Sequence, residues 1–155
     1  MNRDSIYRSV RSHFRILERL TQRASASRGL WLACLGGVLL FGIAAAAPSP
    51  QTVLFLGDSI TAGYGLELSQ AYPALIQQRI KKEGLNFKVI NAGQSGDTSA
   101  GGLARMDWLL KNKIDVLVLE LGGNDGLRGL PVEVIRKNLQ AIIDRARKQY
   151  PQIKI

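Results

Sequence analysis

Short apolar runs alternate with amphipathic helical segments along residues 51–155, and this alternation constrains the fold more than any other feature. Three runs have the length of buried strands, and each is followed within three residues by glycine: Gln51–Leu56, Phe87–Ile90 and Val116–Leu121. Runs that are apolar on both faces are typical of parallel strands covered by helices. The sequence therefore predicts an α/β fold, with a parallel sheet and helices on both of its faces.

The segments between these runs carry apolar residues at the three- and four-residue spacing of helices. We expect Ser69 to cap the first helix and Gly84 to end it, and Pro131 to begin the third. We also expect Tyr72 and Trp108 to be packing residues. The apolar stripes are Tyr72, Leu75, Ile76 and Ile80; then Leu103, Met106, Leu109 and Leu110; then Ile135, Leu139, Ile142, Ile143 and Ala146.

The last residues, Ile153–Ile155, predict the start of a fourth strand. A doubly wound sheet is normally wider than this. We therefore expect the sequence to be a fragment, truncated within its fourth strand.

The N-terminal segment has the pattern of a secretory signal. Seven Arg residues precede an uncharged stretch, whose most apolar part, Leu30–Ile43, contains the single Cys34. Ala44–Ala46 provides small residues for cleavage after Ala46, so we expect residues 1–46 to be leader and residues 47–155 to be the N-terminal part of a folded domain. The mature chain would be periplasmic or secreted. The alternative is an uncleaved anchor at residues 30–47 facing the periplasm, the only membrane contact we expect.

The net charge of +9 does not indicate nucleic-acid binding, because the positive residues form no cluster outside the leader. One Cys excludes a disulfide framework, and one His excludes a multi-His metal site. We expect no nucleic-acid partner, no metal and no cofactor.

Three loops rich in glycine and small polar residues follow the three strands: Gly57–Thr61, Gly93–Thr98 and Gly122–Asp125. In an open parallel sheet, ligands bind beyond the carboxyl ends of the strands. Ser59 offers a hydroxyl nucleophile, Gly96 a backbone N–H and Asn124 a side-chain amide. A hydroxyl with such donors suits acyl transfer through a tetrahedral oxyanion.

Simpler interpretations apply to other polar residues of these loops. Asp58, Asp97 and Asp125 could form a magnesium site, but we favour turn formation for all three. We expect Glu120 to point to a polar edge or to pair locally, and Arg128 to be a solvated loop residue. A phosphoryl-transfer site is disfavoured, because the first loop lacks a paired Asp-x-Asp.

Together the three loops resemble the SGNH (GDSL-type) hydrolase family, in its bacterial thioesterase I/lysophospholipase and arylesterase branch. The matching segments are Gly57–Tyr64, Ser95–Thr98 and Glu120–Gly129. The resemblance implies a three-layer flavodoxin-like fold and hydrolysis of small acyl esters or thioesters without a cofactor. It also implies Ser59 as nucleophile, with the Ser59 N–H, the Gly96 N–H and Asn124 as the oxyanion hole.

The sequence departs from the family in one respect. The family's C-terminal Asp-x-x-His block, which supplies the catalytic Asp and His, is absent, and the only histidine is His13 in the leader. We therefore expect residues 1–155 alone to be essentially inactive. The alternative is a non-catalytic, membrane-anchored binding module on the same fold, if the chain ends at Ile155.

Overall fold

A computed structural model of the chain describes residues 48–155. The expectations for the leader, including Cys34, His13 and the cleavage site after Ala46, lie outside these residues. In the described part, no helix is both long enough and apolar enough to span a bilayer.

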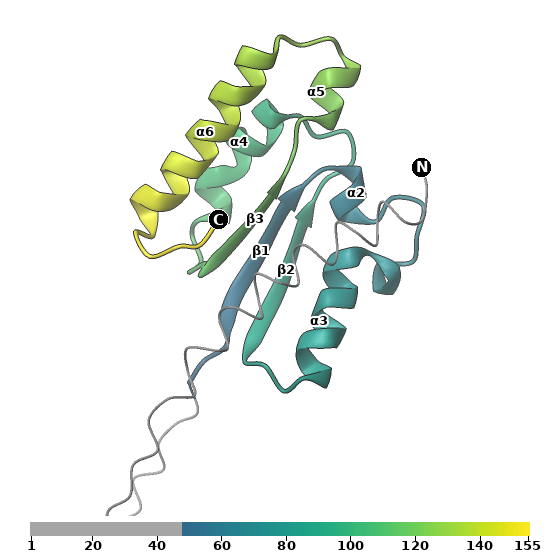
Figure 1. The fold of residues 1–155 in the computed structure, drawn as a ribbon, viewed down its shortest axis with the longest axis vertical. Helices are drawn as coiled ribbons and strands as arrows, with labels where there is room; N and C mark the ends of the chain where they lie inside the picture. Colours follow the sequence, from purple (N-terminus) through teal and green to yellow (C-terminus); the bar gives the residue numbers. More distant parts are fainter. Residues whose placement is uncertain (1–47) are drawn as a thin grey trace, which may run out of the picture. The chain divides into compact units, whose positions relative to one another are not determined.

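Three parallel strands form one sheet in the order β2-β1-β3, with β1 in the centre (Figure 1). The strands are β1 (Gln51–Gly57), β2 (Phe87–Gly93) and β3 (Val116–Glu120). The helices are α2 (Ser59–Ala62), the 3₁₀ turn η1 (Leu68–Gln70), α3 (Tyr72–Lys82), α4 (Ser99–Leu109), α5 (Gly123–Leu127) and α6 (Val132–Gln149). The short helices α2 and α5 lie beyond the carboxyl ends of β1 and β3.

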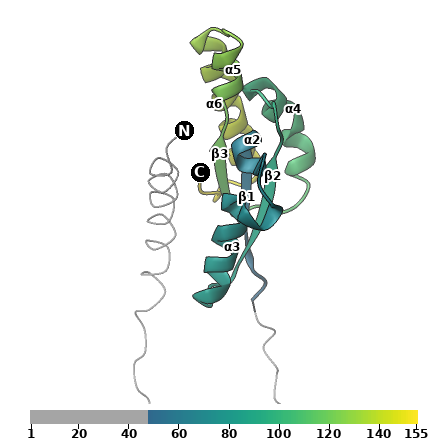
Figure 2. The same cartoon turned by 90° about the vertical axis from the view of Figure 1, so that its right-hand side faces the viewer.

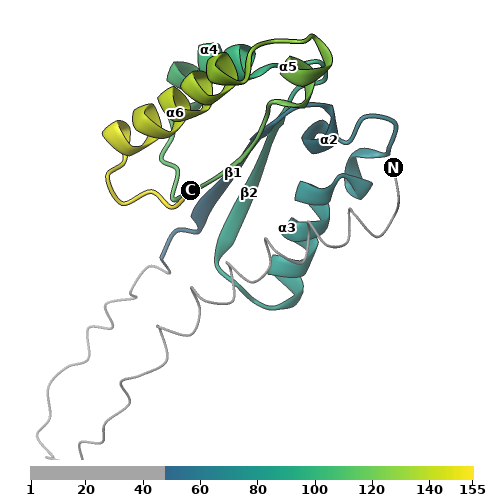
Figure 3. The ribbon, with the colours of Figure 1, turned by 45° about the horizontal axis from the view of Figure 1, so that its top comes forward.

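Helices cover both faces of the sheet, as the apolar strand runs predict (Figure 3). On one face, α4 and α6 pack over Leu54 and Leu56 of β1 and Leu117 of β3. On the opposite face lies α3, where the ring of Tyr72 meets Phe55 of β1 edge-to-face at 5.5 Å between centroids. Residues of β1 thus alternate between two cores.

The larger core lies under α4 and α6 and is entirely apolar. Met106 of α4 and Ile142 and Ala146 of α6 have no exposed surface there. These residues belong to the helical stripes expected from the sequence, so the periodicity correctly predicts which faces of α4 and α6 are buried.

Strand β2 is longer than predicted, because Asn91, Ala92 and Gly93 continue the strand instead of ending it. They pair in register with Phe55, Leu56 and Gly57 of β1. The predicted turn residues remain in the ladder because β1 provides a partner for each of them. The predicted fourth strand is in turn reduced to a single parallel bridge, between Lys154 and Val116.

Three expectations for the helices are wrong. Ser69 does not cap α3; it lies within the 3₁₀ turn, and Ala71 occupies the cap. Trp108 is 68% exposed, because Met106 and Leu109 face the core from the neighbouring positions of α4. Leu75 is likewise exposed, although it belongs to the apolar repeat of α3.

Candidate functional site

The first loop places Ser59 directly after the central strand. The Asp58 carboxylate accepts the Ile60 N–H at 2.9 Å and so caps α2, whose first residue is Ser59. Ser59 is half-buried, and its hydroxyl makes no hydrogen bond within residues 48–155. In the same range its backbone N–H donates to no other backbone group. The nucleophile expected from the sequence therefore has both groups available to a ligand.

The second loop turns at Gly96, which has a φ of 81°. The turn is closed by the Asp97 N–H, which donates to the Gln94 carbonyl at 3.1 Å. A glycine suits this position, because side chains rarely tolerate positive φ. A Cβ at Gly96 would meet nothing within 4 Å. The backbone here borders open space, which leaves room for a ligand.

The third loop joins the other two through Asn124 of α5. Its amide nitrogen donates to the Asp97 carbonyl at 2.8 Å and to the Asp58 carboxylate at 3.3 Å. A further bond of 3.0 Å runs from the Gln94 N–H to the Gly57 carbonyl. The chain neighbours of Ser59 and Gly96 are thus both tied to Asn124, and the three loops meet at one edge of the sheet. From the side (Figure 2), α5 again lies beyond the end of β3.

Glu120 at the end of β3 does not pair locally. Its carboxylate accepts the hydroxyl of Thr61, a fully buried residue of α2, at 2.9 Å. Burial raises the pKa of Glu120, and the nearby Asp58 carboxylate adds to this effect. Burial also raises the pKa of Tyr72 to about 12, and its hydroxyl lies 2.8 Å from the Thr61 oxygen.

A second buried polar group was not predicted from the sequence. Asp125 accepts the backbone N–H of Ser99 at 2.7 Å and its hydroxyl at 2.6 Å, and Asn138 of α6 donates to the same hydroxyl at 3.0 Å. Asp125 and Ser99 have no exposed surface. Asp125 lies next to Asn124 in the third loop, but nothing in the pattern identifies Ser99 or Asn138 as its partners.

The acidic residues of the loops form separate contacts rather than one cluster. Asp58 caps α2, Asp97 forms an ion pair with Arg105 at 2.6 Å, and Asp125 holds Ser99. In the described part of the chain, no three His, Cys, Asp or Glu side chains gather as a metal site. Only Asp58 makes the local turn contact that the sequence suggests, whereas Asp97 and Asp125 bind Arg105 and Ser99, which lie 8 and 26 residues away along the chain.

Arg128 lies on the surface but is not purely solvated. Its guanidinium donates to the Gly96 carbonyl at 3.0 Å and so links the third loop to the second. This contact uses the carbonyl of Gly96 and not its N–H.

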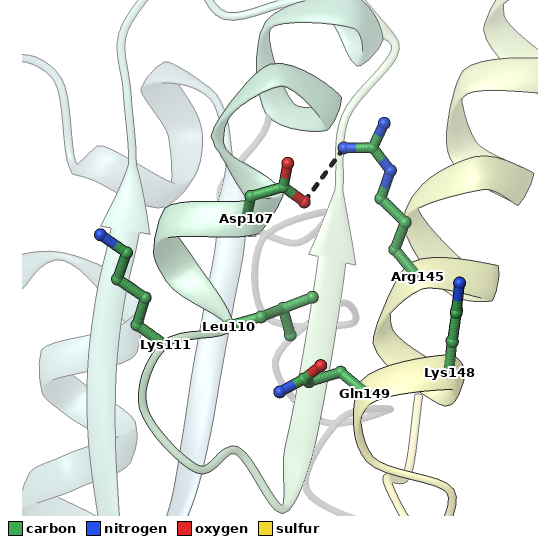
Figure 4. A pocket seen from close by; sticks show the side chains of 6 residues that line it. All are labelled: Asp107, Leu110, Lys111, Arg145, Lys148 and Gln149. Carbon is green, nitrogen blue, oxygen red and sulfur yellow. Dashed lines mark hydrogen bonds and ion pairs between the residues drawn. The ribbon is translucent and has the colours of Figure 1, made fainter.

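A pocket of about 530 Å³ lies elsewhere, between the C-terminal parts of α4 and α6 (Figure 4). Arg145 reaches across it to Asp107 at 3.3 Å. Lys111 points away from Lys148, so the cations do not converge on a common point. Because α4 starts at the carboxyl edge and runs back along the sheet, this pocket lies away from Ser59.

Comparison with known proteins gives a match to one family model. The model of the GDSL-like Lipase/Acylhydrolase family matches residues 55–155. An esterase, TesA of Pseudomonas aeruginosa, is 50% identical over 117 residues, 75% of this chain and 56% of that protein. The thioesterase 1/protease 1/lysophospholipase L1 of Escherichia coli K12 is 47% identical over 107 residues, covering 68% of this chain and 49% of that protein.

Solved structures share the same fold. A crystal structure of TesA matches with 48% identity and a TM-score of 0.64, covering 67% of this chain and 57% of that one. The SGNH-hydrolase family esterase AlinE4 matches with 39% identity and a TM-score of 0.63, covering 68% and 57%. These matches confirm the predicted α/β fold and the resemblance to SGNH hydrolases. The chain spans about half the length of the curated relatives it matches.

Proposed function

The chain belongs to the GDSL-like lipase/acylhydrolase family, and from this we propose that it forms the nucleophile-bearing part of a serine ester hydrolase. The substrates are small acyl esters or thioesters, the chemistry named in its esterase and thioesterase relatives. Ser59 is the nucleophile. Its N–H, the Gly96 N–H and the Asn124 amide form the oxyanion hole.

The hydrogen bonds of Asn124 are the observation that carries this proposal. They connect the residue after the Gly96 N–H donor to the residue before the nucleophile. One amide hydrogen makes the shorter bond to the Asp97 carbonyl, and the other makes the longer bond to Asp58. The bond to Asp58 is long at 3.3 Å and therefore weak, so a developing oxyanion placed nearer the amide would replace it.

The reaction proceeds through an acyl-enzyme. The Ser59 oxygen bonds to the carbonyl carbon and loses its proton to a base, while the carbonyl oxygen becomes the oxyanion. Collapse of this intermediate breaks the bond to the leaving alcohol or thiol, which takes the proton from the base. Water then attacks the acyl group with the help of the same base, releasing the acid and restoring Ser59.

The base is not among residues 48–155, since the only histidine of the sequence is His13. We propose that an Asp-x-x-His block encoded beyond Ile155 supplies it, in a polypeptide here called the longer chain. The same proposal places the enzyme in the periplasm or outside the cell, with cleavage after Ala46. The support is the Arg-rich segment before Leu30 and the small residues Ala44–Ala46.

The experiment has two steps. Sequencing the coding DNA beyond Ile155 tests for an in-frame Asp-x-x-His block. The longer chain is then assayed on short-chain p-nitrophenyl esters and thioesters beside its Ser59→Ala variant, with residues 1–155 alone as a second sample.

We expect Ser59-dependent turnover from the longer chain and essentially none from residues 1–155, because a serine triad without its base retains only residual catalysis. Turnover that survives Ser59→Ala would contradict the assignment of the nucleophile. Edman sequencing of the exported protein tests the cleavage site. A mature chain that retains Leu30–Ile43 would show an anchor instead.

A further inference from the structure

The helix that carries Ser59 is very short and has only one buried residue. Helix α2 spans four residues, and Thr61 is the buried one. A helix of one turn is not stable by itself, so its position depends on contacts with the rest of the fold. The position of Ser59 therefore depends strongly on what holds Thr61, two residues along the same turn.

Thr61 is held by groups from three other elements, β2, α3 and β3. Its carbonyl accepts the Asn91 amide of β2 at 2.9 Å. Its hydroxyl contacts Tyr72 of α3 and Glu120 of β3 at 2.8 and 2.9 Å. Gly57 leaves space for this arrangement, because a Cβ there would lie 2.0 Å from the Thr61 hydroxyl oxygen.

The direction of these hydrogen bonds follows from the number of protons. A threonine hydroxyl has a single proton, and the Thr61 hydroxyl donates it to Glu120. Tyr72 must then donate to the Thr61 oxygen, and it keeps its proton at neutral pH because burial raises its pKa to about 12. The bonds form one directed chain, from Tyr72 through Thr61 to the Glu120 carboxylate.

We propose that Glu120 is a positioning residue for the nucleophile: as the terminal acceptor of this chain it fixes Thr61, and through Thr61 the turn that presents Ser59 and its N–H. The inference rests on the proposed esterase function. Among residues 48–155 no hydrogen bond joins Glu120 to Ser59, Gly96 or Asn124, so we assign it a positioning role rather than a catalytic one. Loss of the acceptor would free the Thr61 hydroxyl to rotate and would loosen the only buried anchor of α2.

The test compares Glu120→Ala with Glu120→Gln in the longer chain. Glutamine keeps a carbonyl oxygen that accepts the Thr61 hydroxyl, whereas alanine removes the acceptor. We expect Glu120→Ala to lower kcat about 10- to 100-fold with little change in KM, because a displaced nucleophile slows chemistry more than binding. Glu120→Gln should stay within about threefold of the wild type. Glu133→Ala, at an exposed acid of α6, is the matched control.

Three results decide the proposal. A wild-type kcat in Glu120→Ala overturns it, and so does an equal loss in Glu120→Gln, which would point to the charge instead of the acceptor. If Glu120→Ala does not fold, Thr61→Val and Thr61→Ser replace it. We then expect only the valine variant, which lacks the hydroxyl, to lose turnover, and equal kcat values in this pair overturn the proposal. The proposed esterase function is tested separately, because turnover that persists in Ser59→Ala would contradict that function and not the role of Glu120.

Discussion

The carboxyl edge of the sheet and the layer beneath α4 and α6 bury opposite kinds of side chain. Within residues 48–155, every buried polar side chain lies at the carboxyl edge, in the three loops or at the helix starts that follow them. These residues are Asp58, Thr61, Asp97, Ser99 and Asp125. The core under α4 and α6 is aliphatic, apart from the thioether of Met106.

The difference shows how the two regions are specified. The aliphatic core needs only apolar residues of suitable volume, and such cores tolerate much substitution. At the edge, each buried side-chain nitrogen or oxygen of the described residues has a hydrogen-bond partner, and removing one partner leaves another group unsatisfied. The edge therefore holds its loops in one arrangement, which is what a site built from three separate loops requires.

Asn124→Ala should have the largest effect, because this side chain connects the loops of Ser59 and Gly96. We expect kcat of the longer chain to fall about 10²- to 10³-fold, with KM changed much less. Steady-state kinetics on a p-nitrophenyl ester measures this. Asn86→Ala is the matched control, since the side chain of Asn86 bonds only the Pro48 carbonyl, at the opposite end of β1. Full kcat in Asn124→Ala would exclude Asn124 from the oxyanion hole.

Asp125→Ala tests whether the polar edge also supports the fold. It leaves the buried N–H and hydroxyl of Ser99 without their acceptor. We expect the free energy of unfolding to fall by about 2–4 kcal/mol, the cost of two buried donors without acceptors. Urea denaturation of the longer chain measures it, with the exposed Asp144→Ala as control. A loss below about 1 kcal/mol would mean that water replaces Asp125 easily.

Glu120 makes the contribution of the edge to the free energy of unfolding depend on pH, whereas the buried residues described in the aliphatic core contain no group that titrates. Burial raises its pKa above the unfolded value of 4.5, so the folded chain binds this proton more tightly. The contribution of Glu120 to the free energy of unfolding should therefore fall as pH rises from 4.5 through the folded pKa. Glu120→Gln removes this titration.

The measurement is urea denaturation of both proteins between pH 4 and 7. The stability of the wild type relative to Glu120→Gln should decrease as pH rises. We expect a smaller effect than for Asp125, because Glu120 is only half-buried. If the stability of the wild type relative to Glu120→Gln stays constant or increases with pH, the pKa of Glu120 is not raised in the folded chain.

The sequence predicts the core better than it predicts the edge. Helical periodicity identifies Met106, Ile142 and Ala146 as buried, because burial of apolar faces is a local pattern. Polar partners lie far apart in the chain and have no such period: Ser99 and Asp125 are 26 residues apart, and Thr61 and Glu120 are 59 apart. The loops of the candidate site were found from glycines and strand ends, but the bonds that join them required the structure.

Strand β2 is a second region where the local sequence pattern predicts the structure wrongly. Asn91, Ala92 and Gly93 have the composition of a turn, yet they remain in the sheet. The pairing with β1 overrides their weak strand propensity. Asn91 also uses its side chain to hold Thr61, a role that local pattern cannot reveal.

Trp108→Ala should have the smallest effect. This variant tests the burial of Trp108 expected from helical periodicity against the exposure seen in the structure. If Trp108 were a packing residue, its truncation would cost about 3–5 kcal/mol. The side chain is 68% exposed, so we expect a change in the free energy of unfolding of about 0.5 kcal/mol or less. Met106→Ala, two residues earlier on the buried face of α4, should cost about 2–5 kcal/mol in the same urea titration. Equal losses in the two variants would mean that α4 is rotated relative to the sheet, with Trp108 sharing the core.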